Sequence, residues 1–239
     1  MKISIITPTL NSEKHLKNVL TSIHSQTFGE IEHVVVDGGS SDQTLDILKE
    51  LSPKSKVINQ KGKGIYDAIN TGIQKITGEY FCILNSDDIF NKNTTLEELG
   101  RLLEKDKSID LIYGDLVYVN TNNEVIRYWV AQNLSPGIGK VPPHPSCFYK
   151  TKVFKKIVYS TDFKISGDFE FLIRVLKDNT IHKFYLNEII VRMSIGGISN
   201  KSLNNYLISL KEDSKILKNH RYNFPVLRAL LKKLIKLKQ

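Results

Sequence analysis

Residues 31–42 read IEHVVVDGGSSD, and this stretch decides the fold class of a chain of 239 residues. Its first six residues are mainly apolar and β-branched, which is typical of a strand buried on both faces of a sheet. A polar turn from Asp37 to Asp42 follows at once, and Ser41 or Asp42 can cap the helix that the next apolar residues predict. A strand that runs through a polar turn into a helix is half of a βαβ unit.

The same order of elements repeats on both sides of this stretch. A strand is expected at residues 3–7 and is followed by a helix with apolar residues at helical spacing. After residue 42 come a helix, a short strand at 57–58, a helix at 65–76 and a strand at 80–84. This alternation predicts an α/β fold with a mostly parallel central sheet flanked by helices.

Polar residues follow three of these strands at the point where each strand ends. They are Thr7-Pro8-Thr9, Asp37 to Asp42, and Asn85 to Asp88. The carboxyl ends of parallel strands form the ligand-binding edge of such sheets, so the three clusters are expected to converge. Turn formation explains the second cluster well. It explains the adjacent carboxylates of Asp87 and Asp88 poorly, because two like charges at the end of a strand repel each other. A cation such as Mg²⁺ or Mn²⁺ would relieve this repulsion.

Other features exclude several classes of protein. Hydrophobic residues make up 41% and charged residues 25%, which is a globular composition, and two cysteines give no disulfide framework. No apolar run reaches the roughly 18 residues that a membrane span needs. The stretch Lys61-Gly-Lys-Gly64 can bring backbone amides to a phosphate, but it is not a P-loop and a plain turn explains it better.

The net charge of +9 comes from the C-terminus. After Asp213 there is no acidic residue, and without the eight basic residues from Lys215 onward the chain holds 26 Lys and Arg against 25 Asp and Glu. A helix over the last residues would collect leucines on one face and Arg228, Lys232, Lys233 and Lys236 on the other. This pattern is typical of a helix on an anionic membrane surface. The alternatives are a helix docked on its own domain with a solvated basic face, or a contact between two copies.

Charge therefore gives no reason to expect a nucleic-acid partner, because the body of the chain is nearly neutral. The predicted organisation is one folded domain over residues 1–212 and a basic amphipathic helical tail over 213–239.

Four motifs occur in order within the first ninety residues. They are ISIITPTLN at 3–11, VVVDGGSSD at 34–42, GIYDAINTG at 64–72 and GEYFCILNSDD at 78–88. Together they resemble a bacterial family 2 glycosyltransferase of the GT-A fold. The resemblance continues more loosely through His144–Phe148 and Ser166–Arg174, and so covers roughly residues 1–200.

The resemblance implies that residues 1–212 are a catalytic domain, with a nucleotide-binding half that ends near residue 115 and an acceptor half over 116–212. It also implies roles for matching positions. Nucleotide contacts would come from Thr7, Pro8, Thr9, Asp37, Asp67, Asn70 and Asp87, metal ligands from Asp87 and Asp88, and the catalytic base from Asp168. From the residues alone, a helix cap explains Asp67 and Asp168 as well. Two positions depart from the family pattern, with Asn85 in place of the first aspartate of the metal motif and Gly167 in place of a frequent glutamate.

The resemblance further implies an inverting, metal-assisted transferase of a hexose or an N-acetylhexosamine. The donor would be a nucleotide-diphosphate sugar, by family habit a UDP-sugar, and the acceptor a hydroxyl of a glycan or lipid-linked molecule in bacterial surface polysaccharide synthesis. The expected location is the cytoplasm or the inner face of the cell membrane, and oligomerisation is left open. The alternatives are a catalytically silent homologue that binds nucleotide-sugars, or a sugar-1-phosphate nucleotidyltransferase, whose Gly-rich basic signature after the first strand is missing here.

Overall fold

The computed structural model of the protein describes residues 1–60, 64–194 and 203–238. The strands are β1 (Ile3–Thr9), β2 (Ile31–Asp37), β3 (Lys56–Asn59), β4 (Tyr80–Ile83), β5 (Asp88–Phe90), β6 (Leu111–Val119), β7 (Val125–Trp129), β8 (Cys147–Lys150) and β9 (Lys183–Ser194). The helices are α1 (Glu13–His24), α2 (Thr44–Leu51), α3 (Ile65–Lys75), α4 (Thr95–Lys105), α5 (Thr151–Phe154), α6 (Gly167–Lys177), α7 (Leu203–Asn219) and α8 (Pro225–Lys238), with 3₁₀ turns η1 (Pro136–Ile138) and η2 (His144–Ser146). The predicted α/β fold is confirmed.

One sheet runs through the molecule in the order β3-β2-β1-β4-β8-β6-β9-β5, with β7 paired to β6. The pairings of β1 with β2 and β4, and of β2 with β3, are parallel as predicted. Beyond β4 the sheet is mixed, because β8 inserts antiparallel between β4 and β6. A four-residue apolar run such as β8 carries no signal for its direction in a sheet, so the sequence did not reveal this strand.

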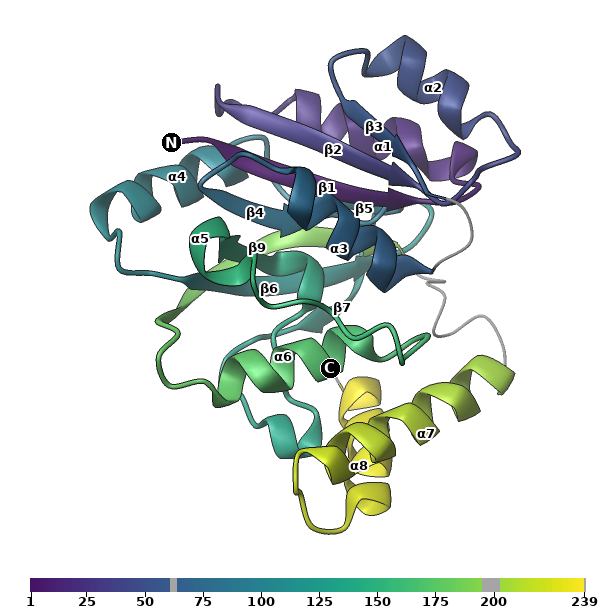
Figure 1. Cartoon of the computed structure of the whole chain (residues 1–239), viewed down its shortest axis with the longest axis vertical. Coiled ribbons are helices and arrows are strands. Elements are labelled where there is room, and N and C mark those ends of the chain that lie inside the picture. Colours follow the sequence, from purple (N-terminus) through teal and green to yellow (C-terminus); the bar gives the residue numbers. More distant parts are fainter. Residues whose placement is uncertain (61–63, 195–202, 239) are drawn as a thin grey trace.

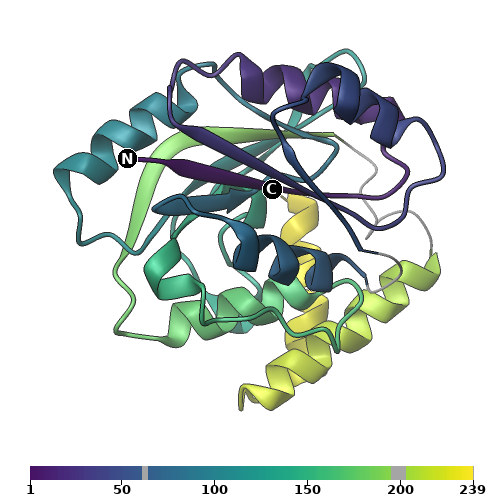
Figure 2. The ribbon, with the colours of Figure 1, turned by 45° about the horizontal axis from the view of Figure 1, so that its top comes forward.

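Helices cover both faces of the sheet (Figures 1 and 2). Alternation along β1 explains the two layers, since successive side chains of a strand point to opposite faces. Ile5 packs with Leu99 of α4 on one face, where Leu16 of α1 also contributes to the buried apolar layer. Ile6 packs with Ile73 of α3 on the other face, in the cluster that also holds α6.

Helices α7 and α8 form a hairpin at one end of the molecule, drawn in yellow at the bottom of Figure 1. Ile216 and Leu217 of α7 and Ala229 of α8 are fully buried in the same apolar cluster as α3 and α6. The helical tail therefore packs on the domain, and the proposed boundary at residue 212 falls inside α7.

The amphipathic helix expected near the C-terminus is α8. The docked alternative had its basic face in solvent, but in the structure Lys232 faces inward and the leucines face outward. Lys232 is only 5% exposed, whereas Leu227 is 56% and Leu234 56% exposed. The cause is Asp213 of α7, which is fully buried and whose Oδ1 accepts a hydrogen bond from the Nζ of Lys232 at 2.6 Å. Leaving a buried carboxylate without a cation costs more free energy than leaving these leucines exposed to solvent. No helix in the described ranges is long and apolar enough to cross a membrane.

Candidate functional site

Three polar segments meet at the sheet edge where β1, β2 and β4 end. The parallel register places Thr9 beside Asp37, and the Oγ1 of Thr9 donates to Oδ1 of Asp37 at 3.1 Å. After β1, the Oγ of Ser12 donates to the Oγ of Ser86 at 2.7 Å, which joins the first segment to the acidic loop after β4. The convergence expected from strand alternation is therefore present.

Asp37 holds the turn that follows β2. Its Oδ2 accepts the backbone N–H groups of Gly39 and Ser40, each at 2.9 Å, and its Oδ1 accepts the Oγ of Ser40. The carboxylate is fully buried. These contacts give Asp37 a structural role in the turn, and its contact with a nucleotide base stays a prediction.

The first strand end is supported from inside the sheet. Thr7 is fully buried, Pro8 is buried, and the Oγ1 of Thr7 lies 3.0 Å from Nε2 of His33. Burial, with a smaller contribution from His24, lowers the pKa of His33 to about 3. Thr7 therefore faces a neutral imidazole, and its contribution to nucleotide binding stays a prediction, as do those of Pro8 and Thr9.

The two carboxylates after β4 differ in their surroundings. Asp88 begins β5 and is fully buried, and its Oδ2 accepts the Nδ2 of Asn85 at 2.8 Å. Its Oδ1 is buried without a hydrogen-bond partner among the described residues. Burial, followed by the charge of Asp87, raises the pKa of Asp88 well above its ordinary value. Asp87 is half-buried at the same loop.

These carboxylates fit a divalent cation. An unpaired buried oxygen beside a second carboxylate is a costly arrangement that a hard cation would satisfy. No cluster of three or more His, Cys, Asp or Glu side chains suited to a metal occurs in the described part of the chain. Such a pair suits Mg²⁺ or Mn²⁺, which keep waters and take further ligands from phosphates. The presence of asparagine at position 85 is also explained, because its amide donates to Asp88 and an ionised carboxylate at position 85 could not donate.

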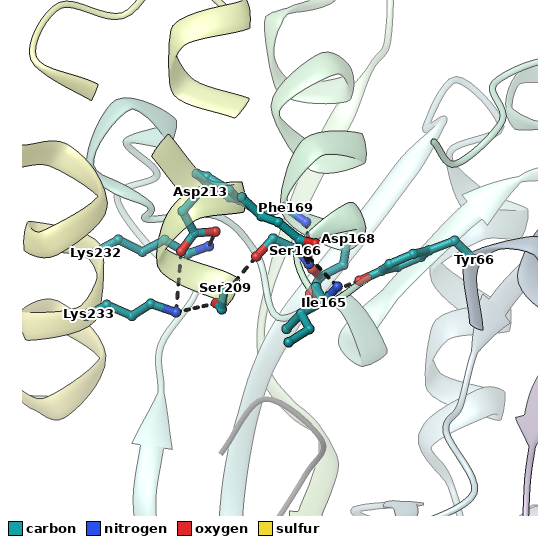
Figure 3. Close-up of polar contacts among 10 residues, drawn as sticks. Tyr66, Ile165, Ser166, Asp168, Phe169, Ser209, Asp213, Lys232 and Lys233 are labelled. Atoms are coloured by element: carbon teal, nitrogen blue, oxygen red, sulfur yellow. Dashed lines mark hydrogen bonds and ion pairs between the residues drawn. The ribbon is translucent and has the colours of Figure 1, made fainter. Parts of the chain in front are cut away.

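Asp168 lies in the first turn of α6, one residue beyond a close backbone contact. A Cβ atom on Gly167 would lie 2.7 Å from the ring of Tyr66, whose Oη donates to the carbonyl of Ile165 at 2.6 Å. Figure 3 shows this ring beside Asp168 and the loop before it. Glycine therefore stands at 167 because a side chain does not fit beside Tyr66. The N-cap of α6 is Ser166, so the competing cap role of Asp168 is wrong.

The electrostatics link the two acidic groups. Burial chiefly raises the pKa of Tyr118, and the charges of Asp88 and Asp168 raise that pKa further. The guanidinium of Arg127 lies over the Tyr118 ring, 3.6 Å from its centroid, and lowers the pKa. The charges of Asp88 and Asp168 are smaller causes than burial, and both act on the same side chain of β6.

The remaining predicted residues hold neighbouring segments. The Nε2 of Gln60 donates to Asp67. The amide of Asn70 pairs with both backbone polar groups of Tyr159, at 2.8 Å each. Their nucleotide contacts stay predictions. Residues 61–63, most of the expected phosphate-approaching loop, lie outside the described residues.

Three further side chains lie near Asp168, and of these only His144 falls in a segment that the family resemblance covers. His144 is buried with Nε2 2.8 Å from the Oη of Tyr159, and burial lowers its pKa while Asp168 raises it. Lys232 of α8 lies with its Nζ 3.5 Å from the ring centroid of Phe169, the residue after Asp168. Glu212 of α7 accepts backbone N–H groups of the loop before Asp168. Only tertiary packing brings these side chains together.

Comparisons with known proteins agree with this geometry. The model of the family described as Glycosyl transferase family 2 matches residues 4–163. A PGL/p-HBAD biosynthesis glycosyltransferase of Mycobacterium bovis (strain BCG / Pasteur 1173P2) is 32% identical over 204 residues, covering 82% of this chain and 78% of the relative.

Solved structures give the same fold. S. aureus TarS 1–349 in complex with UDP-GlcNAc has a TM-score of 0.69 at 22% identity, covering 96% of this chain and 69% of that one. In another TarS structure this chain covers 41% of the TarS chain. The mannosyltransferase PcManGT from Pyrobaculum calidifontis, in complex with GDP-Man and Mn²⁺, has a TM-score of 0.65 at 15% identity, covering 97% and 73%.

Proposed function

The chain belongs to glycosyl transferase family 2 and is a glycosyltransferase with a GT-A fold, and from this premise we propose how it works. It moves a sugar from a nucleotide-diphosphate sugar to a hydroxyl of a glycan or lipid-linked acceptor, with inversion at the anomeric carbon. The observation that carries the proposal is a pair of acidic groups: Asp88, whose Oδ1 is buried without a hydrogen-bond partner among the described residues, and Asp168 in the first turn of α6. One carboxylate serves the diphosphate end of the donor and the other serves the acceptor.

Asp168 is the general base. Its carboxylate is half-buried in the first turn of α6 and takes the proton of the acceptor hydroxyl as that oxygen attacks the anomeric carbon. The bond from the anomeric carbon to the phosphate oxygen breaks, and the nucleoside diphosphate leaves with the bonding electrons. A single base without a covalent nucleophile gives in-line displacement and inversion. General bases of this kind accelerate reactions by about 10²–10⁴-fold.

Asp87 and Asp88 would hold Mn²⁺ or Mg²⁺ at the diphosphate. When bound, the ion supplies charge neutralisation for the leaving group. Asn85 keeps one oxygen of Asp88 oriented through its 2.8 Å hydrogen bond, so the other oxygen is free to meet a cation. The donor is proposed to be a UDP-sugar, in line with the UDP-GlcNAc complex of the TarS relative. Thr7, Pro8, Thr9, Asp37, Asp67 and Asn70 are proposed to line or shape the nucleotide side.

The acceptor sugar is proposed to bind beyond Tyr118. A pocket of about 200 Å³ follows β7, with Trp129, Asn133 and Lys140 among its lining residues. The ring of Trp129 stacks on Tyr118 with centroids 6.5 Å apart. An aromatic face beside a few polar groups is a suitable platform for a sugar.

Activity is tested with a panel of UDP-, GDP- and dTDP-sugars and Mn²⁺, measured as release of the nucleoside diphosphate. Asp168→Asn should lower turnover by about 10²–10⁴-fold with little change in donor affinity. Asp88→Ala should weaken the Mn²⁺-dependent thermal shift with the nucleotide. Turnover unaffected by Asp168→Asn would contradict the base assignment. Binding without turnover in the wild type would favour a silent homologue, the second candidate that Asn85 supports.

The α8 helix is proposed to place the enzyme at the cytoplasmic face of an anionic membrane. Its outward face is apolar, with Val226, Leu227, Leu230, Leu231 and Leu234 all between 38% and 58% exposed. Lys215, Lys218 and Arg221 of the same hairpin are exposed, and their charges favour anionic headgroups.

Leu227→Ser combined with Leu230→Ser tests this without exposing Asp213, which deletion of the helix would do. Sedimentation with phosphatidylglycerol vesicles should fall at least severalfold for this variant, and wild-type binding to neutral phosphatidylcholine vesicles should be weaker. Equal sedimentation of both proteins with anionic vesicles would refute the proposal.

A further inference from the structure

Three consecutive backbone amides before Asp168 converge on one carboxylate from another part of the chain. The N–H of Lys164 donates to Oε1 of Glu212 at 2.7 Å. The N–H groups of Ile165 and Ser166 donate to Oε2 of Glu212 at 3.0 and 2.8 Å. Hydrogen bonds to an ionised acceptor are shorter and stronger than neutral ones, so this contact fixes the path of the loop.

The same loop is held on its other side by Tyr66. The Oη of Tyr66 donates to the carbonyl of Ile165, and the ring leaves no room for a Cβ atom on Gly167. Residues 165–167 therefore lie between a tyrosine of α3 and a glutamate of α7. Asp168 is the next residue, so its backbone position follows from these two contacts.

Helix α7 is itself anchored by α8. Asp213, adjacent to Glu212, takes Nζ of Lys232 at 2.6 Å and Nζ of Lys233 at 3.4 Å. Lys233 also donates to Ser209, whose Oγ lies 3.4 Å from the Oγ of Ser166 (Figure 3). The C-terminal hairpin thus reaches the loop before Asp168 through two separate sets of contacts.

We propose that Glu212 is a positioning residue for the general base, which sets where the carboxylate of Asp168 lies relative to the acceptor hydroxyl. This inference rests on the proposed role of Asp168. Glu212 acts through the backbone of residues 164–166, whose N–H groups it accepts, and these three residues are not among those assigned to the nucleotide. A misplacement of about 1 Å can cost about 10²-fold in rate, so loss of the contact should lower kcat more than it changes donor KM.

The test uses Glu212→Gln and Glu212→Ala, with Lys211→Ala as the matched control on the same helix. Lys211 is exposed, so its change should leave turnover unaltered. With the sugar nucleotide that gives the highest wild-type turnover in the donor panel, kcat should fall about 10- to 100-fold for Glu212→Ala. Glu212→Gln keeps one carbonyl oxygen and should recover part of that loss. Donor KM should stay within twofold of the wild-type value, and the thermal shift with UDP should equal that of the wild type within error.

The kcat–pH profile separates positioning from simple loss of structure. Folded Glu212 variants should keep the acid limb of the profile at a reduced height, because Asp168 is still present. The proposal would be overturned if folded Glu212→Gln and Glu212→Ala both kept the wild-type kcat. It would also be overturned if donor KM rose while kcat stayed constant. Full activity of Asp168→Asn would instead remove the proposed base itself, whatever the Glu212 variants do.

Discussion

Asp213→Ala should destabilise the C-terminal hairpin strongly, because it leaves two ammonium groups beside each other without their shared anion. Asp213 is fully buried, Lys232 is 5% exposed, and their charged atoms are 2.6 Å apart. Removing one partner of a buried ion pair costs about 3–5 kcal/mol. Lys232→Met keeps the aliphatic volume and leaves Asp213 with Lys233 at 3.4 Å, so it should cost less, about 1.5–3 kcal/mol.

The double variant Asp213→Ala/Lys232→Met should be more stable than Asp213→Ala alone, since it removes the stranded charge together with its partner. Urea unfolding followed by circular dichroism at pH 7 gives the three differences in the free energy of unfolding, with m-values as a check on two-state behaviour. A cost below about 1 kcal/mol for Asp213→Ala would refute the reasoning, since breaking a buried pair should cost about 3–5 kcal/mol. A double variant no more stable than Asp213→Ala would refute it as well.

Three further predictions concern the sheet edge and the site. His33 has a pKa of about 3 in the folded chain against an ordinary 6.5, so the unfolded chain binds a proton first as pH falls. The free energy of unfolding should therefore drop by about 1.4 kcal/mol per pH unit below pH 6.5. His33→Gln should flatten this slope in urea midpoints measured between about pH 7 and 5, and an unchanged slope would contradict the prediction. Gly167→Ala should cost about 1–3 kcal/mol in urea unfolding because the added Cβ meets the Tyr66 ring, and a neutral effect would mean that the ring yields. Asn85→Asp should add a third carboxylate beside Asp88 and make the thermal shift with UDP depend more steeply on Mn²⁺, an effect absent if residue 85 is remote from the ion.

The N-terminal half of the fold could be predicted because its strands are buried and its helices are amphipathic. The strand predicted at 57–58 corresponds to β3 (Lys56–Asn59), and the helix predicted at 65–76 corresponds to α3 (Ile65–Lys75). Beyond residue 110 the sequence was less informative. The four residues of β8 have no periodicity long enough to reveal their direction.

The candidate site divides in the same way. Asp87 and Asp88 could be singled out because they follow a buried strand, whereas Asp168 was singled out by the family resemblance. Glu212 and Lys232 could not, since their roles depend on how α7 and α8 fold back onto α6. The periodicity of α8 correctly separated its leucines from its lysines, but the choice of inward face depends on Asp213, a single residue on another helix.

The contact between the Tyr66 ring and Gly167 also limits how this protein can change over generations. The two positions are about a hundred residues apart in the chain, yet any side chain beyond glycine at 167 would enter space that the ring fills. A glutamate could therefore be accepted at 167 only after position 66 had become smaller, whereas the reverse order passes through a defective intermediate. Selection would therefore act on the two positions in a fixed order, and grafting a larger residue at 167 from a relative without a smaller residue at 66 should fail.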